Sequence, residues 1–194
     1  GLSFFAIGIL IAFREIATNV LEIPSGSMAD LLGRRRAMQV SFAAYLGSFL
    51  MFWQATEQRW LWPAMLLFAI GDAFRTGTHK AMIFAWLQAE GRSNDKTQVY
   101  GYTRSWSKLG SATSVVIGAA LLFWLDSYAA VFWLSAVPVA LNLINLSSYP
   151  SYLDGELRTG SRLRDVWQHS RAAMIEGISN PRLRALWIES MSFE

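Results

Sequence analysis

Five apolar segments, each long enough to cross a lipid bilayer as a helix, follow one another along this chain of 194 residues. A bilayer core about 30 Å thick is spanned by roughly 20 mostly apolar residues in helical form. Short polar stretches separate the segments, which cover residues 4–24, 37–55, 61–87, 100–125 and 128–147. Because backbone groups inside a bilayer must be hydrogen-bonded within the protein, this series predicts an all-α, polytopic membrane bundle.

The composition agrees with a membrane protein. Charged residues make up 16% of the chain, against about 25% in typical soluble domains. Cysteine is absent, so a disulfide framework and a cysteine-based metal site are both excluded. The two histidines, His79 and His169, are not part of a metal-binding motif. We therefore expect no metal, no other cofactor and no nucleic-acid partner.

The last part of the chain differs from the first. Residues 150–182 are rich in charge and carry a partial helical stripe of apolar residues, which predicts a cytoplasmic linker with an amphipathic helix. Residues 183–194 are apolar again and are expected to begin another span. Since the chain opens without Met and stops inside this apolar segment, we expect it to be a fragment of a longer protein.

The distribution of basic residues predicts the orientation of the spans. Cytoplasmic loops of membrane proteins carry an excess of Lys and Arg. One side of the expected bundle has a single basic residue in its short loops, Arg59. The other side collects Arg34, Arg35, Arg36, Arg92, Lys96, Arg158, Arg162, Arg164 and Arg171. We expect the crowded side to face the cytoplasm and the protein to reside in the cytoplasmic (inner) cell membrane.

Polar and ionisable residues lie inside the spans, where a charge costs about 2.5–3.5 kcal/mol on insertion scales. In the third span Asp72 and Arg75 are spaced to pair within the helix, and His79 continues their stripe. A hydrated cavity between the helices would explain these residues together and would suggest a substrate or proton path. The candidates for such a path are Glu15, Asn19, Glu22, Asp72, Arg75, Arg104 and Lys108.

Two alternatives compete with a transport path. Lys80, Arg104 and Lys108 lie toward the cytoplasmic ends of their spans and could extend to the lipid headgroups. Glu15 and Arg75 could instead form a purely structural ion pair. The nearest loop is about 10 residues from Glu15, Asp72 or Arg75, which is roughly 15 Å along a helix, so headgroup contact explains these three less well.

The stretch GSMADLLGRRRAM, residues 26–38, resembles the signature loop of major facilitator superfamily transporters. The family pattern is roughly G-x-L-A-D-R-x-G-R-[RK]-x-x-L, between the family's second and third helices. The positions that match are Gly26, Ala29, Asp30, Gly33, Arg34 and Arg35. Leu31 departs from the pattern, which often has Arg there. The stretches EIPSG and GDAFRTGTHKAM are also similar to a bacterial, efflux-like branch.

The resemblance implies the N-terminal half of such a transporter, from helix two to helix six, followed by the central linker and the start of helix seven. The first helix and the C-terminal half would be missing partners on the same polypeptide. The resemblance also implies a gating role for the signature loop, through Gly26, Asp30, Gly33, Arg34 and Arg35. The family's acid near the end of its fourth helix and its Gly-Pro antiporter motif are both absent.

The expected function is secondary active transport of a small solute by alternating access, with proton-coupled efflux as one form. An intramembrane enzyme is disfavoured because the sequence has no HExxH, no GxSxG and no phosphate-binding glycine loop. A non-transporting scaffold or receptor on the same fold remains the alternative. The charges inside the spans favour transport, since a scaffold does not need them.

Overall fold

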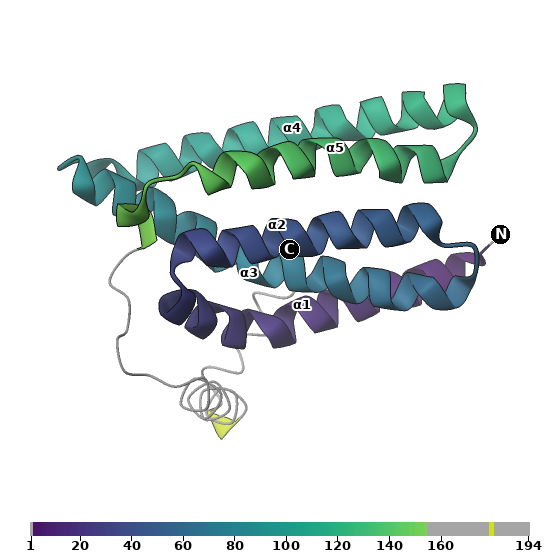
Figure 1. The fold of residues 1–194 in the computed structure, drawn as a ribbon, viewed down its shortest axis with the longest axis horizontal. Coiled ribbons are helices and arrows are strands. Elements are labelled where there is room, and N and C mark those ends of the chain that lie inside the picture. Colours follow the sequence, from purple (N-terminus) through teal and green to yellow (C-terminus); the bar gives the residue numbers. More distant parts are fainter. Residues whose placement is uncertain (1, 155–178, 181–194) are drawn as a thin grey trace.

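In the computed structural model, five long helices form the bundle, and the structure describes residues 2–154 and 179–180 (Figure 1). The described part is all-α, as predicted from the apolar segments. The long helices are α1 (Phe4–Leu32), α2 (Arg34–Gln54), α3 (Leu61–Ala89), α4 (Lys96–Leu125) and α5 (Tyr128–Ser147). Three short 3-10 turns lie between or after them, namely η1 (Gln58–Trp60), η2 (Ser93–Asp95) and η3 (Ser151–Asp154).

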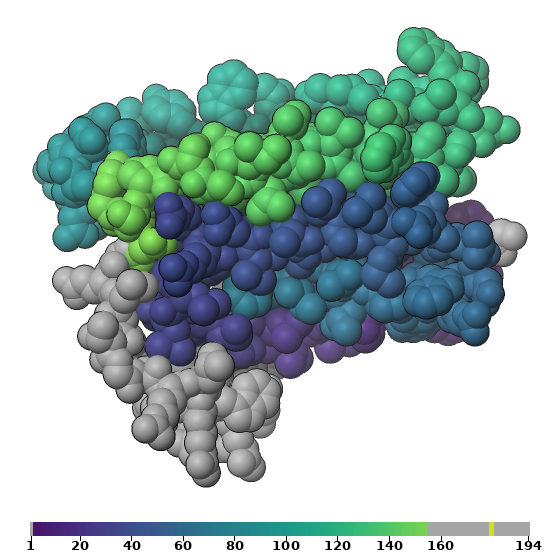
Figure 2. Space-filling model, in the orientation of Figure 1, coloured from purple at the N-terminus to yellow at the C-terminus, as the bar shows by residue number. Residues whose placement is uncertain are grey.

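Helix α3 is the centre of the packing. It packs extensively against both α1 and α2, while α2 also packs against α5. Figure 2 shows α5 lying along α2 over most of its length. Helix α4 has few contacts, which it makes with α3 and α5, and none of its residues is buried. The described part is therefore a tight α1–α2–α3–α5 group with α4 loosely attached.

Helix α1 continues through the stretch that was expected to be a polar connection. It ends at Leu32, and α2 begins at Arg34, so Gly33 alone separates the two helices. Gly33 has φ 90° and ψ 143°, a backbone conformation that glycine alone adopts readily. The polar residues after Pro24 had suggested a loop, but Asp30 and its neighbours are compatible with a helix end that reaches beyond the apolar segment.

Three helical segments are long and apolar enough to cross a membrane, against the five expected from the sequence. They are Phe4–Leu32, Ser93–Leu125 and Tyr128–Ser147. The stretches 37–55 and 61–87 are helical in α2 and α3, but within the described residues these two helices are not among those that are long and apolar enough to cross a membrane. Of the expected linker and final span, only residues 150–154 and 179–180 fall within the described residues.

Three buried serines tie the neighbouring helices to the backbone of α3. Ser41 and Ser48 of α2 donate to the carbonyl oxygens of Gly71 (2.6 Å) and Ala64 (2.8 Å). Ser25 of α1 donates to the carbonyl of Ala73 at 2.8 Å. Contacts between membrane helices commonly use small residues, which let the backbones approach closely, and hydroxyl groups, which form hydrogen bonds across the helices.

The Ser41→Ala variant should measure the contribution of one such bond. We expect its free energy of unfolding to fall by about 1 kcal/mol, the value typical of a hydrogen bond between membrane helices. The matched control is Ser105→Ala in α4, whose hydroxyl bonds only within its own helix, to Gly101. We expect the control to change stability by less than about 0.5 kcal/mol. Denaturant titration in mixed micelles measures both values, and equal losses would contradict the assignment.

Candidate functional site

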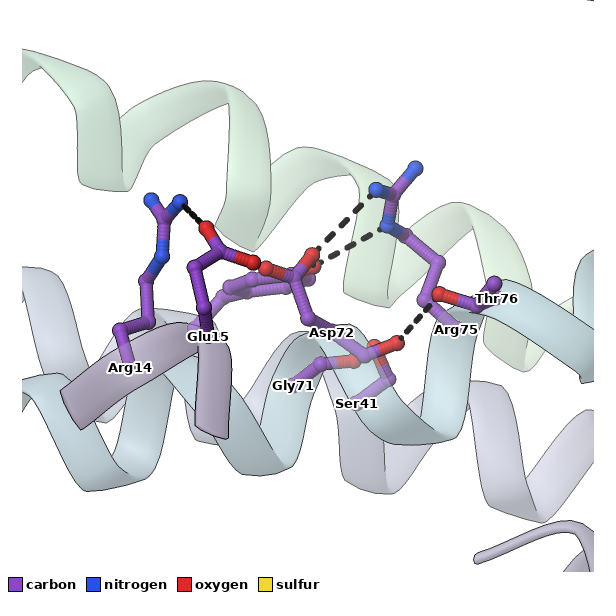
Figure 3. A network of polar contacts seen from close by, with 8 residues as sticks. Arg14, Glu15, Ser41, Gly71, Asp72, Arg75 and Thr76 are labelled. Atoms are coloured by element: carbon purple, nitrogen blue, oxygen red, sulfur yellow. Dashed lines mark hydrogen bonds and ion pairs between the residues drawn. The ribbon is translucent and has the colours of Figure 1, made fainter. Parts of the chain in front are cut away.

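In the middle of α3, two of the predicted residues, Asp72 and Arg75, form a polar cluster with Tyr45 of α2. Arg75 Nη2 lies 3.3 Å from Asp72 Oδ1, which confirms the pairing predicted from their spacing. Arg75 Nε donates to the hydroxyl of Tyr45 at 3.0 Å, and that hydroxyl in turn donates to Asp72 Oδ1. Figure 3 shows the Arg75 guanidinium reaching back to the carboxylate one turn earlier. Tyr45 therefore fixes both members of the ion pair.

A second ion pair lies on α1. Arg14 Nη2 contacts the carboxylate of Glu15, the next residue, and the Arg14 guanidinium lies over the ring of Phe68 with its carbon 5.5 Å from the ring centre. The alternative pair of Glu15 with Arg75 is thus replaced by two pairs, each within one helix. Asn19 donates to the backbone carbonyl of Glu15 at 2.8 Å and stays on the same helix.

A cavity of about 700 Å³ opens beside the Asp72–Arg75 pair. This volume lies within the range of about 300–1,000 Å³ common for small-molecule sites. Helices α2, α3, α4 and α5 all contribute to its wall, together with the segment after α5. Its lining consists of Met38, Phe42, Arg75, His79, Met82, Ile83, Trp86, Thr103, Ser107, Asn142, Leu146, Tyr149, Pro150, Tyr152 and Leu153.

Within the described part of the chain, the side chains of this wall that can carry a charge near neutral pH are basic. Arg75 and His79 are its basic residues, and no acidic residue lines it within the described part of the chain. Asp72 is near, but its carboxylate is held by Tyr45 and Arg75. Neutral hydrogen-bonding groups come from α4 and α5. A solute in the cavity would therefore meet a positive charge, neutral hydrogen-bonding groups and aromatic surface.

Among the seven residues predicted for a path, Arg75 is the one that lines the cavity in the described structure. Arg104 and Lys108 lie on α4 next to two lining residues, Thr103 and Ser107, but are outside the wall. Glu15, Asn19 and Glu22 lie on α1, which contributes no residue to the cavity. The structure brings Asp72 and Arg75 together in one ion pair, and the other five candidates do not line the cavity.

Three of the signature residues, Gly33, Arg34 and Arg35, form a compact junction at one end of the bundle. We call this the arginine-rich end, defined by Arg34, Arg35, Arg36, Arg92 and Lys96. Arg34 Nη1 donates to the carbonyl of Ala81 in α3 at 3.3 Å. Arg35 Nη1 donates to the carbonyl of Tyr149 at 2.8 Å. The two arginines thereby tie the start of α2 to α3 and to the segment that follows α5.

Asp154 completes this junction and was not among the predicted residues. Its Oδ1 accepts a hydrogen bond from the backbone nitrogen of Arg35 at 2.8 Å, so it caps α2 from a distant part of the chain. An anion at a helix N-terminus is favoured because it meets unpaired N–H groups and the positive end of the helix dipole. A lone acid in the stretch SYLD gave no sequence signal for this contact.

The remaining signature residues, Gly26 and Asp30, lie on the last turns of α1 and are exposed. Gly26 has open space around it, with no atom within 4 Å of the position that a Cβ would occupy. The side chain of Asp30 makes no hydrogen bond or ion pair within the described residues. The junction is therefore carried by Gly33, Arg34, Arg35 and Asp154, while Gly26 and Asp30 are exposed.

The comparisons with known proteins agree with this architecture. The family model described as "Major Facilitator Superfamily" matches residues 1–187. The chain therefore belongs to the major facilitator superfamily and is a multi-pass membrane protein of a family of transporters, not enzymes. No curated protein and no solved structure matches the chain significantly.

Proposed function

We propose that this chain moves a small solute across the cytoplasmic membrane by alternating access, through the cavity beside Arg75. The observation that carries the proposal is the cavity itself, which has a charged, hydrogen-bonded arginine in its wall half-way along α3. Superfamily transporters place the substrate near the bilayer midplane and rock two helical bundles around it. A charged residue within a membrane span is otherwise rare and is usually functional.

In this proposal, the junction of Gly33, Arg34, Arg35 and Asp154 acts as a gate. It links α2, α3 and the segment after α5 at the end of the bundle that we place in the cytoplasm. Movement of one bundle against the other would strain or release such a junction. Export coupled to proton uptake is the form we propose, because His79 offers a titratable group in the cavity wall.

Transport should depend on Arg75. In proteoliposomes loaded with a panel of labelled anions, zwitterions and cations, we expect counterflow of at least one solute. The Arg75→Gln variant should reduce it at least about tenfold, the loss of one charged contact worth about 1.4 kcal/mol. Arg59→Gln is the matched control, since Arg59 lies exposed at the other end of the bundle, where it pairs with Glu57 and lies over the ring of Trp60.

An imposed pH gradient in the same vesicles tests proton coupling. Acid outside should accelerate export if uptake of a proton drives it. A flux that does not change with the pH gradient would overturn proton coupling. Absence of flux for every solute of the panel in the wild-type protein would overturn the transport function itself.

A further inference from the structure

We propose that the solute is an amphipathic organic anion, bound with its acidic group at Arg75 and its apolar body toward the arginine-rich end. This rests on the proposed function and names its substrate class. From the sequence alone, the mixed charges inside the spans fit an anion, a zwitterion or an amphipathic drug about equally. The inference comes from which of those charges reach the cavity.

Within the described residues, no acid of the spans lines the cavity. Glu15 is paired with Arg14 on α1, and α1 does not contribute to the wall. The Asp72 carboxylate accepts from Tyr45 and Arg75. A carboxylate is the strongest compensation for a cationic solute taken out of water, and none lines the cavity within residues 2–154 and 179–180, where the charged arginine of the wall would repel a cation. Electrostatics therefore disfavours a cation.

Arg75 is held in position but keeps donors for a ligand. A guanidinium carries five N–H donors. Tyr45 accepts from Nε and Asp72 from Nη2, which leaves Nη1 without a partner among the described residues. The two partners also orient the guanidinium plane, and a preoriented arginine loses less entropy when it binds a carboxylate. His79, one turn further along α3, adds a second donor on the same wall.

The cavity changes character along its length. On α5, Asn142 lies further from the arginine-rich end than Leu146, and on α4, Ser107 lies further from it than Thr103. Trp86, Leu146 and Tyr149 line it closer to the arginine-rich end. Arg75 and Trp86 are eleven positions apart on α3, which corresponds to roughly 16 Å of helix. A solute of that length would place its polar group at the Arg75 end of the cavity and its apolar body at the Trp86 end.

Three probes that share one apolar body test the charge preference directly. They are phenylpropanoate, phenylpropanamide and phenylpropylamine, titrated against the full chain in lipid nanodiscs by calorimetry. We expect the carboxylate to bind at least about tenfold more tightly than the amide, because hydrogen bonds to charged groups are the stronger ones. The amine should bind most weakly. This comparison uses the wild-type protein and needs no variant to fold.

Two variants then assign the two ends of the cavity. Arg75→Gln should reduce the carboxylate-to-amide ratio to about one, while Trp86→Leu should weaken carboxylate and amide by the same factor. Size-exclusion elution of each variant establishes that it folds. The proposal is overturned if the amine or the amide binds as tightly as the carboxylate, or if none of the three binds.

The two proposals fail in different ways. Counterflow of the amine together with weak binding of the carboxylate would retain transport and overturn the anion class. Binding of the carboxylate without flux of any labelled solute would retain the anion site and overturn transport.

Discussion

The Gly71→Ala variant should be strongly destabilised, because Gly71 lies buried in α3 directly beneath the ring of Tyr45. A Cβ at this position would lie 2.8 Å from Tyr45 Cδ1 and 2.9 Å from Cε1. Atoms that close must move apart, and overpacking of this kind typically costs about 1–3 kcal/mol. The Gly71 carbonyl also accepts the Ser41 hydroxyl, so a shift of α2 would weaken that bond too. Thermal or denaturant unfolding in mixed micelles measures the loss.

Gly77→Ala is the matched control for this experiment. Gly77 is also in α3, but a Cβ there would meet no atom within 4 Å. Since alanine is favoured over glycine in a helix by about 1 kcal/mol, the control should be neutral or stabilised. If the two variants had equal stability, the close packing of Tyr45 on α3 would be wrong.

A movement of Tyr45 has a functional consequence as well. Its hydroxyl bonds both Asp72 and Arg75, so a displaced ring would free the guanidinium from one of its two supports. Gly71→Ala should consequently reduce counterflow even at temperatures where the variant is folded. Gly77→Ala should retain the wild-type rate.

The Gly33→Ala variant should disrupt the junction between α1 and α2. Gly33 has φ 90°, and a Cβ would lie 2.8 Å from Asp154 Oδ1. A residue with a side chain in this backbone region costs about 1–3 kcal/mol, and the contact adds a steric clash with the carboxylate that caps α2. We expect loss of the Asp154 contact, lower stability and reduced counterflow.

Two further variants separate backbone strain from the clash. Gly91→Ala places a side chain at φ 69° with no atom within 4 Å, so it reports strain alone. In the Asp154→Ala background the clash with the carboxylate is removed, and Gly33→Ala should then cost less than in the wild type. Additive losses in this double-mutant cycle would show that Asp154 does not contact the junction.

The sequence predicted the helices well, because length and apolar character along one segment are local properties. It misplaced the end of α1, which continues to Leu32 although the residues after Pro24 are polar. Polarity marks where a span leaves the apolar layer and does not by itself end a helix. Helix α1 ends just before Gly33, which has a positive φ. Hydropathy does not report backbone conformation, so it gave no signal for this position.

The site was predictable only where its contacts are local. Asp72 and Arg75 are three residues apart on one helix, and their pairing follows from that spacing. Tyr45 reaches them from α2, and Asp154 reaches Arg35 across 119 positions of sequence, so neither contact has a local signature. On α4 the charged pair Arg104 and Lys108 was predicted, but each lining residue lies one position earlier. One position turns a helix by about 100°, and neighbouring helices decide which face is inward.

Labelling of single cysteines most directly tests the claim that the cavity beside Arg75 is the solute path. The chain contains no cysteine, so each introduced thiol is the one that reacts. Asn142 of α5 lines the cavity, while Ile144, two positions along, is 69% exposed and does not line it. We predict that a membrane-impermeant thiol reagent labels Asn142→Cys and that a transported solute slows this reaction. Ile144→Cys should stay unlabelled in the bilayer. Equal labelling of both positions, or labelling of Asn142→Cys that no transported solute changes, would contradict the account.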